Sequence, residues 1–222
     1  MREPASGTEV RRASFWFLVL PCLVGMAAWE GARLLLQRLP DLAEATQPVW
    51  SVVRAVLLLA PAALVTRRAL GEPVAQGLWL GAPARDGLVR AIVTGVVYLV
   101  LVNALGAALG GSFALPSVTL FGLLLVLFDA AVEEALFRGF LLSHLLPGRR
   151  FASVNLLQAL VFVLPHTRMF AGLGAAGLGA ALVVIVLSVF VLGLVLGGTA
   201  RPVRSIWIAT VVHAINNLLA SV

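Results

Sequence analysis

The sequence contains no lysine, a single cysteine and few charged residues of either sign. Of its 222 residues, 12% are charged and 61% are hydrophobic, whereas about a quarter of the residues of a typical soluble domain are charged. The mean hydropathy is +1.04. This composition excludes an ordinary soluble domain and predicts an integral membrane protein.

The absence of lysine leaves arginine to carry the formal net charge of +6. A basic balance can indicate nucleic acid or anionic lipid as a partner, and the positions of the basic residues decide between them. The arginines lie between apolar runs and form no single patch, which is typical of topology signals in membrane proteins. We therefore expect the lipid bilayer, and no nucleic acid, among the partners.

The single cysteine, Cys22, excludes an internal disulfide and is expected to pack within the first apolar run. Residues 1–13 and this run have the outline of a signal peptide. The run is longer than such a segment needs and further apolar runs follow, so we expect it to be retained as the first helix.

Seven apolar runs are long enough to be membrane helices, because about 20 helical residues cross the hydrocarbon core. Helices fit such continuous runs better than barrel strands, since each helix satisfies its own backbone in lipid. The predicted fold is therefore all-α, a polytopic bundle of about seven transmembrane helices. These are expected near residues 14–36, 49–66, 88–110, 117–143, 152–168, 175–198 and 203–221.

The arginines also predict an orientation, because positively charged connections stay in the cytoplasm. With a cytoplasmic N-terminus, only Arg38 and Arg168 fall in outside connections, and an odd number of helices places the C-terminus outside. The connection 66–87, interrupted by Pro73 and Pro83, is expected along the cytoplasmic interface. The inside connections hold Arg2, Arg11, Arg12, Arg67, Arg68, Arg85, Arg90, Arg149, Arg150, Arg201 and Arg204.

A cluster of charged residues interrupts the fourth apolar run. A charge near the bilayer centre costs about 2.5–3.5 kcal/mol on insertion scales, so Asp129 and the segment 133–138, "EEALFR", need partners or a function. Glu134 and Arg138 are four residues apart with the acid first, which predicts an ion pair. Glu133 is turned about 100° away from Glu134, and we expect it to lack a salt-bridge partner.

Two other apolar runs carry polar residues at helical spacing. Phe162 and His166 share one helix face, as do His213 and Asn217. A rise of about 1.5 Å per residue places these histidines at nearly the depth of Glu133, roughly 15 Å from the cytoplasmic helix ends. Their convergence predicts a functional site. The third histidine, His144, lies about 16 Å along the axis from Glu133 and is expected outside this site.

Three separated motifs carry a family resemblance. They are, in chain order, Glu133-Glu134-x-x-x-Arg138, Phe162-x-x-x-His166 and His213-x-x-x-Asn217. Together with the lead-in "SIW" at 205–207, they resemble the CPBP (CAAX protease and bacteriocin-processing, or Abi) family of intramembrane proteases, which includes the type II CAAX prenyl endopeptidases. The resemblance covers about residues 110–222, half of the chain.

The resemblance implies an intramembrane endopeptidase built on the four C-terminal helices. Residues 111–222 would form the protease core, and residues 1–110 would supply N-terminal transmembrane helices. Water would be activated by Glu133 and His166, while His213 and Asn217 would stabilise the oxyanion. Glu134 and Arg138 would support the site. Pro165 departs from the family pattern, and we expect the helix to kink there, which either aims His166 into the site or displaces it.

The candidate site residues allow more than one interpretation of the cofactor and the substrate. Two histidines and a carboxylate are ordinary zinc ligands, but there is no HExxH helix and the ligands would come from three spans. No cofactor is therefore expected, and zinc, with a metalloprotease mechanism, remains the alternative. The expected partner is a membrane-anchored substrate, either a CAAX-like or other protein tail or a peptide.

Two other classes of function also use charged groups at this depth. Intramembrane Glu, His and Arg build proton relays, so a proton-coupled transporter is one rival, although no inverted repeat is visible. A non-catalytic immunity or regulatory protein on the same scaffold is another. A lysine-free chain rich in Ala, Leu and Arg favours a GC-rich bacterial genome, and hence the bacterial inner membrane.

Overall fold

The computed structural model of the protein describes residues 14–36, 38, 47–108, 117–175, 177 and 179–220. All regular structure in these ranges is helical, with no strand, which confirms the all-α prediction. The α-helices are α1 (Phe15–Leu36), α3 (Gln47–Leu64), α4 (Val74–Gly77), α5 (Leu88–Ala108), α6 (Leu120–Glu134), α7 (Ser143–Leu145), α8 (Phe151–Val163), α9 (Thr167–Ala175), α10 (Gly179–Val203) and α11 (Trp207–Ala220).

Helices form in all seven predicted regions, but the count of about seven transmembrane helices is not confirmed. By length and composition, four described helices are apolar enough to span a membrane, and two further apolar helices are shorter, at Phe151–His166 and Trp207–Leu219. The long helix that begins with α6 is interrupted by charged residues. The four candidate spans are Phe15–Leu36, Pro48–Ala69, Arg85–Ala108 and Leu182–Val203.

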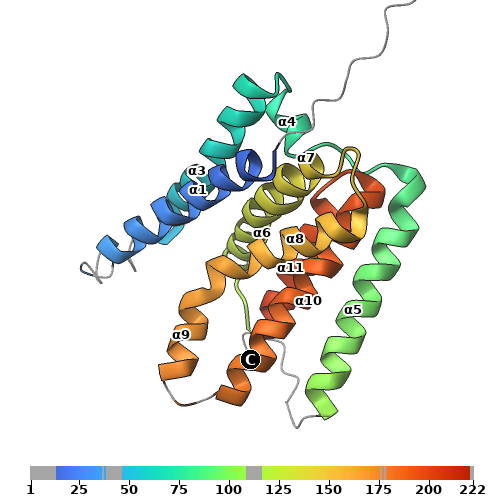
Figure 1. The fold of residues 1–222 in the computed structure, drawn as a ribbon. Helices are drawn as coiled ribbons and strands as arrows, with labels where there is room; N and C mark the ends of the chain where they lie inside the picture. The colour runs from blue at the N-terminus through green and yellow to red at the C-terminus, as the bar shows by residue number, and fades with distance from the viewer. Residues whose placement is uncertain are drawn as a thin grey trace, which may run out of the picture.

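The C-terminal helices form the centre of the bundle. The helix α10 packs against α5, α8 and α11, and α11 in turn packs against α5 and α6. Figure 1 shows these helices side by side, with α5 at one edge and α6 beneath α8. The two buried faces of α6 and α11 therefore meet inside the bundle, where their polar residues are shielded from lipid.

An antiparallel hairpin of α1 and α3 covers the opposite flank. The two helices pack closely on each other, and both contact η3, a wider π-helical segment (Ala135–Leu142) that continues α6. In Figure 1 the hairpin leans away from the other helices at the end where α1 finishes and α3 begins. Its close packing requires Gly25, because a side chain there would collide with the backbone carbonyls of Leu57 and Leu58.

The charged segment of α6 stands where the helix changes its winding. Glu133 and Glu134 end α6, and η3 follows at once, so the rod continues in π-helical geometry as far as α7. Every residue of η3 is buried. Such π-helical turns inside longer helices are frequent at functional sites.

The connection between α3 and α5 is packed onto the bundle. The backbone N–H of Ile206 donates to Trp79 O at 3.2 Å, and the Ser205 hydroxyl donates to Gly81 O at 2.8 Å. The indole N–H of Trp207 donates to Leu80 O at 3.0 Å. These hydrogen bonds of the "SIW" lead-in therefore hold the connection against the start of α11.

The helix that carries His166 is interrupted as Pro165 predicts. The α-helical segment α8 ends at Val163, and a short 3-10 segment, η4 (Leu164–His166), joins it to α9. Proline removes a backbone donor and crowds the preceding turn, so the helix cannot continue in α geometry. Two predicted boundaries were wrong: the segment expected to end near residue 168 continues as α9 to Ala175, and α10 runs on to Val203 before the turn to α11.

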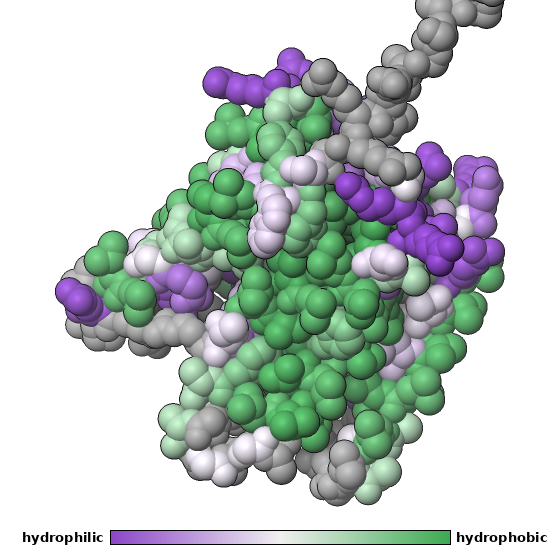
Figure 2. Space-filling view, viewed as in Figure 1, coloured by the Kyte–Doolittle hydropathy of each residue, from purple (hydrophilic) through white to green (hydrophobic). Residues whose placement is uncertain are grey.

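The arginines lie mainly at one end of the molecule. Figure 2 shows most of the hydrophilic surface of this view at the end where Figure 1 places α4 and α7, above an apolar flank. This one-sided distribution agrees with an integral membrane protein. Exposed arginines at this end are Arg67, Arg68, Arg85, Arg90, Arg150, Arg201 and Arg204.

Candidate active site

The three motifs meet inside the bundle, as their matched depths predicted. Glu133 is the second-last residue of α6, His166 ends η4, and His213 lies in α11. His213 Nε2 is 3.8 Å from Glu133 Oε2, and His166 lines the same cavity as Glu133. Side chains from three separate segments are therefore brought together around Glu133.

Glu134 is the buried centre of the motif cluster. Its side chain is 0% exposed, and its Oε1 accepts from Arg138 Nη1 at 3.0 Å, which confirms the predicted ion pair. The same oxygen accepts from His213 Nδ1 at 2.9 Å. Arg138 also donates to Gly193 O of α10 at 3.1 Å. Glu134 thus joins α6, α11 and, through Arg138, α10.

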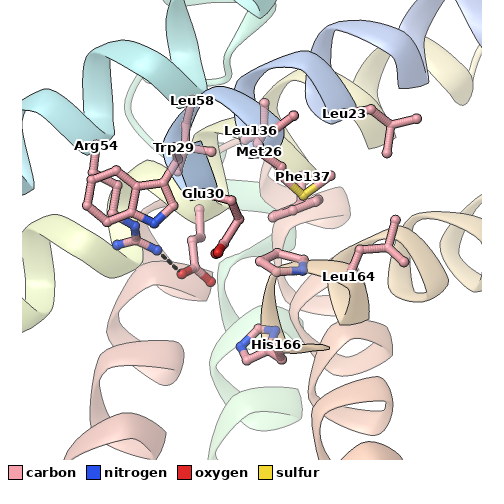
Figure 3. Close-up of a pocket in the computed structure, with 13 residues that line it drawn as sticks. Leu23, Met26, Trp29, Glu30, Arg54, Leu58, Leu136, Phe137, Leu164 and His166 are labelled. Atoms are coloured by element: carbon pink, nitrogen blue, oxygen red, sulfur yellow. Dashed lines mark hydrogen bonds and ion pairs between the residues drawn. The ribbon is translucent and has the colours of Figure 1, made fainter. Parts of the chain in front are cut away.

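The prediction that Glu133 has no salt-bridge partner was wrong. Arg54 of α3 forms an ion pair with Glu133 through Nη2 and with Asp129 through Nη1, the latter at 3.0 Å. Figure 3 shows the guanidinium of Arg54 turned toward this carboxylate. The sequence did hold a signal, because Arg54 is the one charged residue in the apolar run 49–66 and such residues tend to be functional.

The two oxygens of Glu133 have different surroundings. Oε1 is held by Arg54. Oε2 is buried and has no hydrogen-bond partner among the residues that the structure describes, while His213 lies at 3.8 Å, too far for a direct bond. A buried carboxylate oxygen without a donor is costly to keep. Oε2 of Glu134 is also without a hydrogen-bond partner, but of these two glutamates Glu133 alone lines the cavity, so its Oε2 is better placed to accept a proton from a small molecule.

Both site histidines have their Nδ1 atoms engaged. His166 Nδ1 lies 3.1 Å from Phe162 O, and His213 Nδ1 lies 2.9 Å from Glu134 Oε1. A carbonyl and a carboxylate only accept, so in each ring Nδ1 carries the proton. In the neutral form of each histidine, the lone pair is then on Nε2, the nitrogen a general base uses.

Phe162, the phenylalanine of the second motif, packs against both site histidines. It is fully buried, and its centroid lies 5.3 Å from the His166 ring and 5.7 Å from the His213 ring. The guanidinium carbon of Arg138 stands 4.3 Å from the same centroid. Phe162 therefore fixes both imidazoles and takes a cation–π contact from the inner ion pair.

A cavity of about 280 Å³ opens beside Glu133. Figure 3 shows Arg54, Trp29 and Glu30 on one side of it and Leu164 and His166 on the other. A few polar groups, Glu30, Arg54, Glu133 and His166, stand in a mostly apolar wall, an arrangement typical of ligand sites. The apolar wall includes Leu23, Met26, Trp29, Leu58, Phe137 and Leu164 from α1, α3, η3 and η4.

Pro165 does not displace His166 from the cavity. Both residues line it, and η4 places the imidazole on the side facing Arg54 (Figure 3). Of the two outcomes left open by the kink, the structure has the one in which His166 points into the site.

Asn217 lies one helical turn after His213 on α11, and the residue is exposed. It is not among the residues that line the cavity beside Glu133. Its role at an oxyanion stays a prediction. The preceding residue, Asn216, accepts from the Tyr98 hydroxyl at 2.9 Å and so ties α11 to α5.

His144 belongs to a different part of the molecule. It lies in α7, where its Nε2 is 3.3 Å from Glu72 and its Nδ1 is 2.7 Å from Phe140 O. Glu72 stands in the connection between α3 and α5, so this pair fastens that connection to the end of η3 and α7.

The described residues do not present a ready metal site. Among them, no group of three or more His, Cys, Asp or Glu side chains is arranged so that it could hold a metal ion. Glu133 faces a guanidinium through Oε1, and His213 uses Nδ1 for Glu134. Zinc would have to compete with Arg54 for the carboxylate of Glu133, so these residues fit a zinc site poorly.

Comparison with known proteins found one family model that matches the C-terminal part of the chain. A family model described as type II CAAX prenyl endopeptidase Rce1-like matches residues 115–219. This match confirms the resemblance that the three motifs predicted. Comparison with curated proteins and with solved structures gave no match.

Proposed function

Because residues 115–219 belong to the Rce1-like family of type II CAAX prenyl endopeptidases, we propose that the protein is an intramembrane endopeptidase with Glu133 as its general base. The observation that carries the proposal is the buried, unbonded Oε2 of Glu133, which lies beside His213 and on the same cavity as His166. Hydrolysis of a peptide bond needs an activated water, an oxyanion site and a proton donor for the leaving amine.

In the proposed reaction, Glu133 and His166 activate the water. Water held between Glu133 Oε2 and His166 Nε2 gives a proton to Glu133 while its oxygen attacks the carbonyl carbon of the substrate. The C–N bond then breaks, and the proton on Glu133 passes to the leaving nitrogen. One water is consumed, and a carboxylic acid and an amine are formed.

In the proposed reaction, His213 and Asn217 stabilise the oxyanion. Since Nδ1 of His213 is engaged by Glu134, this ring donates to the oxyanion from Nε2 in its protonated form. The carboxylates of Glu133 and Glu134 flank the ring and balance its charge. Donors of this kind contribute about 2.7–4 kcal/mol each to the transition state in characterised enzymes.

The proposed reaction uses no metal, because Arg54 already pairs with the carboxylate of Glu133 and would compete with a metal ion for it. Metal analysis of the purified protein, combined with an assay after chelation, tests this part. Tightly bound zinc whose removal abolishes cleavage would show that the metalloprotease alternative is correct.

The proposed substrate is a membrane-anchored protein tail or peptide, CAAX-like or of another kind. Apart from Glu30 and His166, the walls of the cavity that α1 and η4 contribute are apolar, so they favour a segment that arrives from the lipid phase. The proposed location is the inner membrane of a bacterium, with the N-terminus and the arginine-rich end in the cytoplasm.

The experiment that tests the function has two arms. In the first, purified protein in lipid vesicles is given an internally quenched, farnesylated peptide with a CAAX end. In the second, membrane proteins of a strain that makes the wild-type chain are compared with those of a strain that makes Glu133→Gln. We expect tails to be cut by the wild type in at least one arm and left uncut by the variant.

Absence of cleavage in both arms would contradict the proposal, as would full activity of Glu133→Gln. Ion-dependent uptake that is lost in Glu133→Gln would instead identify a transporter. Complete rescue of a deletion phenotype by Glu133→Gln would identify a non-catalytic protein.

A further inference from the structure

Arg54 reaches the candidate active site from outside the part of the chain that carries the family motifs. It lies in α3, whereas the family match begins at residue 115. The contact joins residues 79 positions apart in the sequence. The N-terminal hairpin therefore contributes a charged group to the site in addition to the apolar wall of the cavity.

The guanidinium of Arg54 bridges two carboxylates on one face of α6. Nη1 lies 3.0 Å from Asp129 Oδ1, and Nη2 binds Glu133 Oε1. Asp129 and Glu133 are four residues apart, so they stand one turn above each other. A planar group held at both nitrogens has little freedom to rotate.

This arrangement fixes the orientation of the Glu133 carboxylate. With Oε1 bound to Arg54, rotation about the last side-chain bond is restricted and Oε2 is directed to the side where His213 stands. The Arg54 side chain is 17% exposed and that of Glu133 is 13% exposed, so solvent weakens the pair less than at a surface. A carboxylate free to turn would present either oxygen, or neither, to the reacting water.

We propose that Arg54 is the positioning residue of Glu133, and that α3 is consequently part of the catalytic machinery. This inference rests on the proposed function, because it assigns Arg54 to the reaction that Glu133 promotes. Arg54 touches neither the reacting water nor the peptide in this account. It acts through the orientation of Glu133.

A purely electrostatic role is the competing explanation. Asp129, Glu133 and Glu134 are three carboxylates against the two guanidinium groups of Arg54 and Arg138, so Arg54 could serve only to balance charge. The double variant Arg54→Gln/Asp129→Asn separates the two roles. It removes one charge of each sign and leaves Glu133 without its bridge.

The test compares four proteins in lipid vesicles: Arg54→Gln, Arg54→Lys, the double variant, and Arg68→Gln as the control. Arg68 is an exposed arginine about 14 residues further along the same helical rod, roughly 20 Å from Arg54. The substrate is the farnesylated quenched peptide, or a synthetic copy of a tail that accumulates uncut in Glu133→Gln. Thermal unfolding in detergent reports whether each variant is folded.

We expect Arg54→Gln and the double variant to lower kcat about 100-fold, the size of effect that a misplaced catalytic group produces. KM should stay within about threefold, since Arg54 makes no uniform contribution to substrate binding. Arg54→Lys should lie between wild type and Arg54→Gln, because lysine restores the charge but not the two-pronged contact. Guanidinium added to the buffer should raise the rate of the double variant, and Arg68→Gln should match the wild type.

Wild-type kcat in the double variant would overturn the proposal and leave only charge balance. An unchanged kcat in a folded Arg54→Gln would overturn it as well. Both results would leave the proposed function intact as long as Glu133→Gln remains inactive. Activity in Glu133→Gln would contradict the proposed function itself, so the two failures are distinguishable.

Discussion

Two ion-pair clusters on the same helix differ in their access to the cavity. The inner cluster, Glu134 with Arg138, has both side chains 0% exposed and is enclosed by α10 and α11. The outer cluster, Arg54 with Asp129 and Glu133, has side chains between 13% and 37% exposed and borders the cavity. Adjacent glutamates thus have different surroundings because successive helical residues point in directions about 100° apart.

This difference suggests a division of work between the two glutamates. A fully enclosed ion pair holds helices together, since breaking it leaves a charge stranded in the interior. A partly exposed carboxylate with one unbonded oxygen can exchange protons with a molecule in the cavity. Substitutions in the inner cluster should therefore lower mainly stability, and substitutions in the outer cluster should lower mainly turnover.

The largest effect is expected at Glu133. Glu133→Gln keeps the shape and a hydrogen-bonding oxygen for Arg54 but removes the base, so turnover should fall by about 10² to 10⁴-fold. The midpoint of thermal unfolding should change little, because Arg54 retains Asp129. The vesicle assay and unfolding in detergent measure the two quantities. A loss of stability as large as the loss of activity would remove the contrast between the clusters.

Glu134→Ala should act mainly on stability. It leaves Arg138 buried without a carboxylate and removes the partner of His213 Nδ1, and the loss of an ion-pair partner in an interior costs about 3–5 kcal/mol. Denaturant titration in mixed micelles measures the change. If Glu134→Ala unfolds at the wild-type denaturant concentration, the inner cluster does not hold the bundle together.

Gly139→Ala should have an intermediate effect on stability. A Cβ at Gly139 would collide with the backbone carbonyl of Leu78 in the connection between α3 and α5, and overpacking of this kind costs about 1–3 kcal/mol. Gly106→Ala is the matched control, since nothing lies within 4 Å of a Cβ there. Equal unfolding midpoints for the two variants would show that the connection is not seated on η3 as described.

The smallest effect is expected at the pair between His144 and Glu72. The Glu72 side chain is 43% exposed, and ion pairs of this kind contribute about 0–1 kcal/mol. Glu72→Gln should therefore keep wild-type turnover and lose at most that much stability. It is also the matched control for Glu133→Gln. A strong loss of cleavage in Glu72→Gln would place His144 inside the functional site.

Sequence spacing was sufficient for contacts within one helix. The Glu134–Arg138 pair follows from an interval of four residues. The break at Pro165 was equally local. Each of these features depends on geometry that a single helix fixes by itself.

Contacts between helices that are distant in the sequence could not be predicted from spacing within one helix. The partner of Glu133 was missed because Arg54 lies 79 residues away, and its position depends on how the hairpin of α1 and α3 packs on α6. The dual role of Glu134 was missed for the same reason, since His213 approaches it from α11. Sequence spacing gives the position of a residue along its own helix. Which faces of two helices contact each other depends on how the helices pack.

The most direct test of the account is the source of the oxygen in the new C-terminus. Membranes that contain the wild-type protein or Glu133→Gln are incubated in water enriched in ¹⁸O, and newly formed C-termini are read by mass spectrometry. The account predicts one ¹⁸O atom in each new carboxyl group with the wild type, and no such termini with Glu133→Gln. Labelled termini that form equally with both proteins would show that Glu133 does not activate the water.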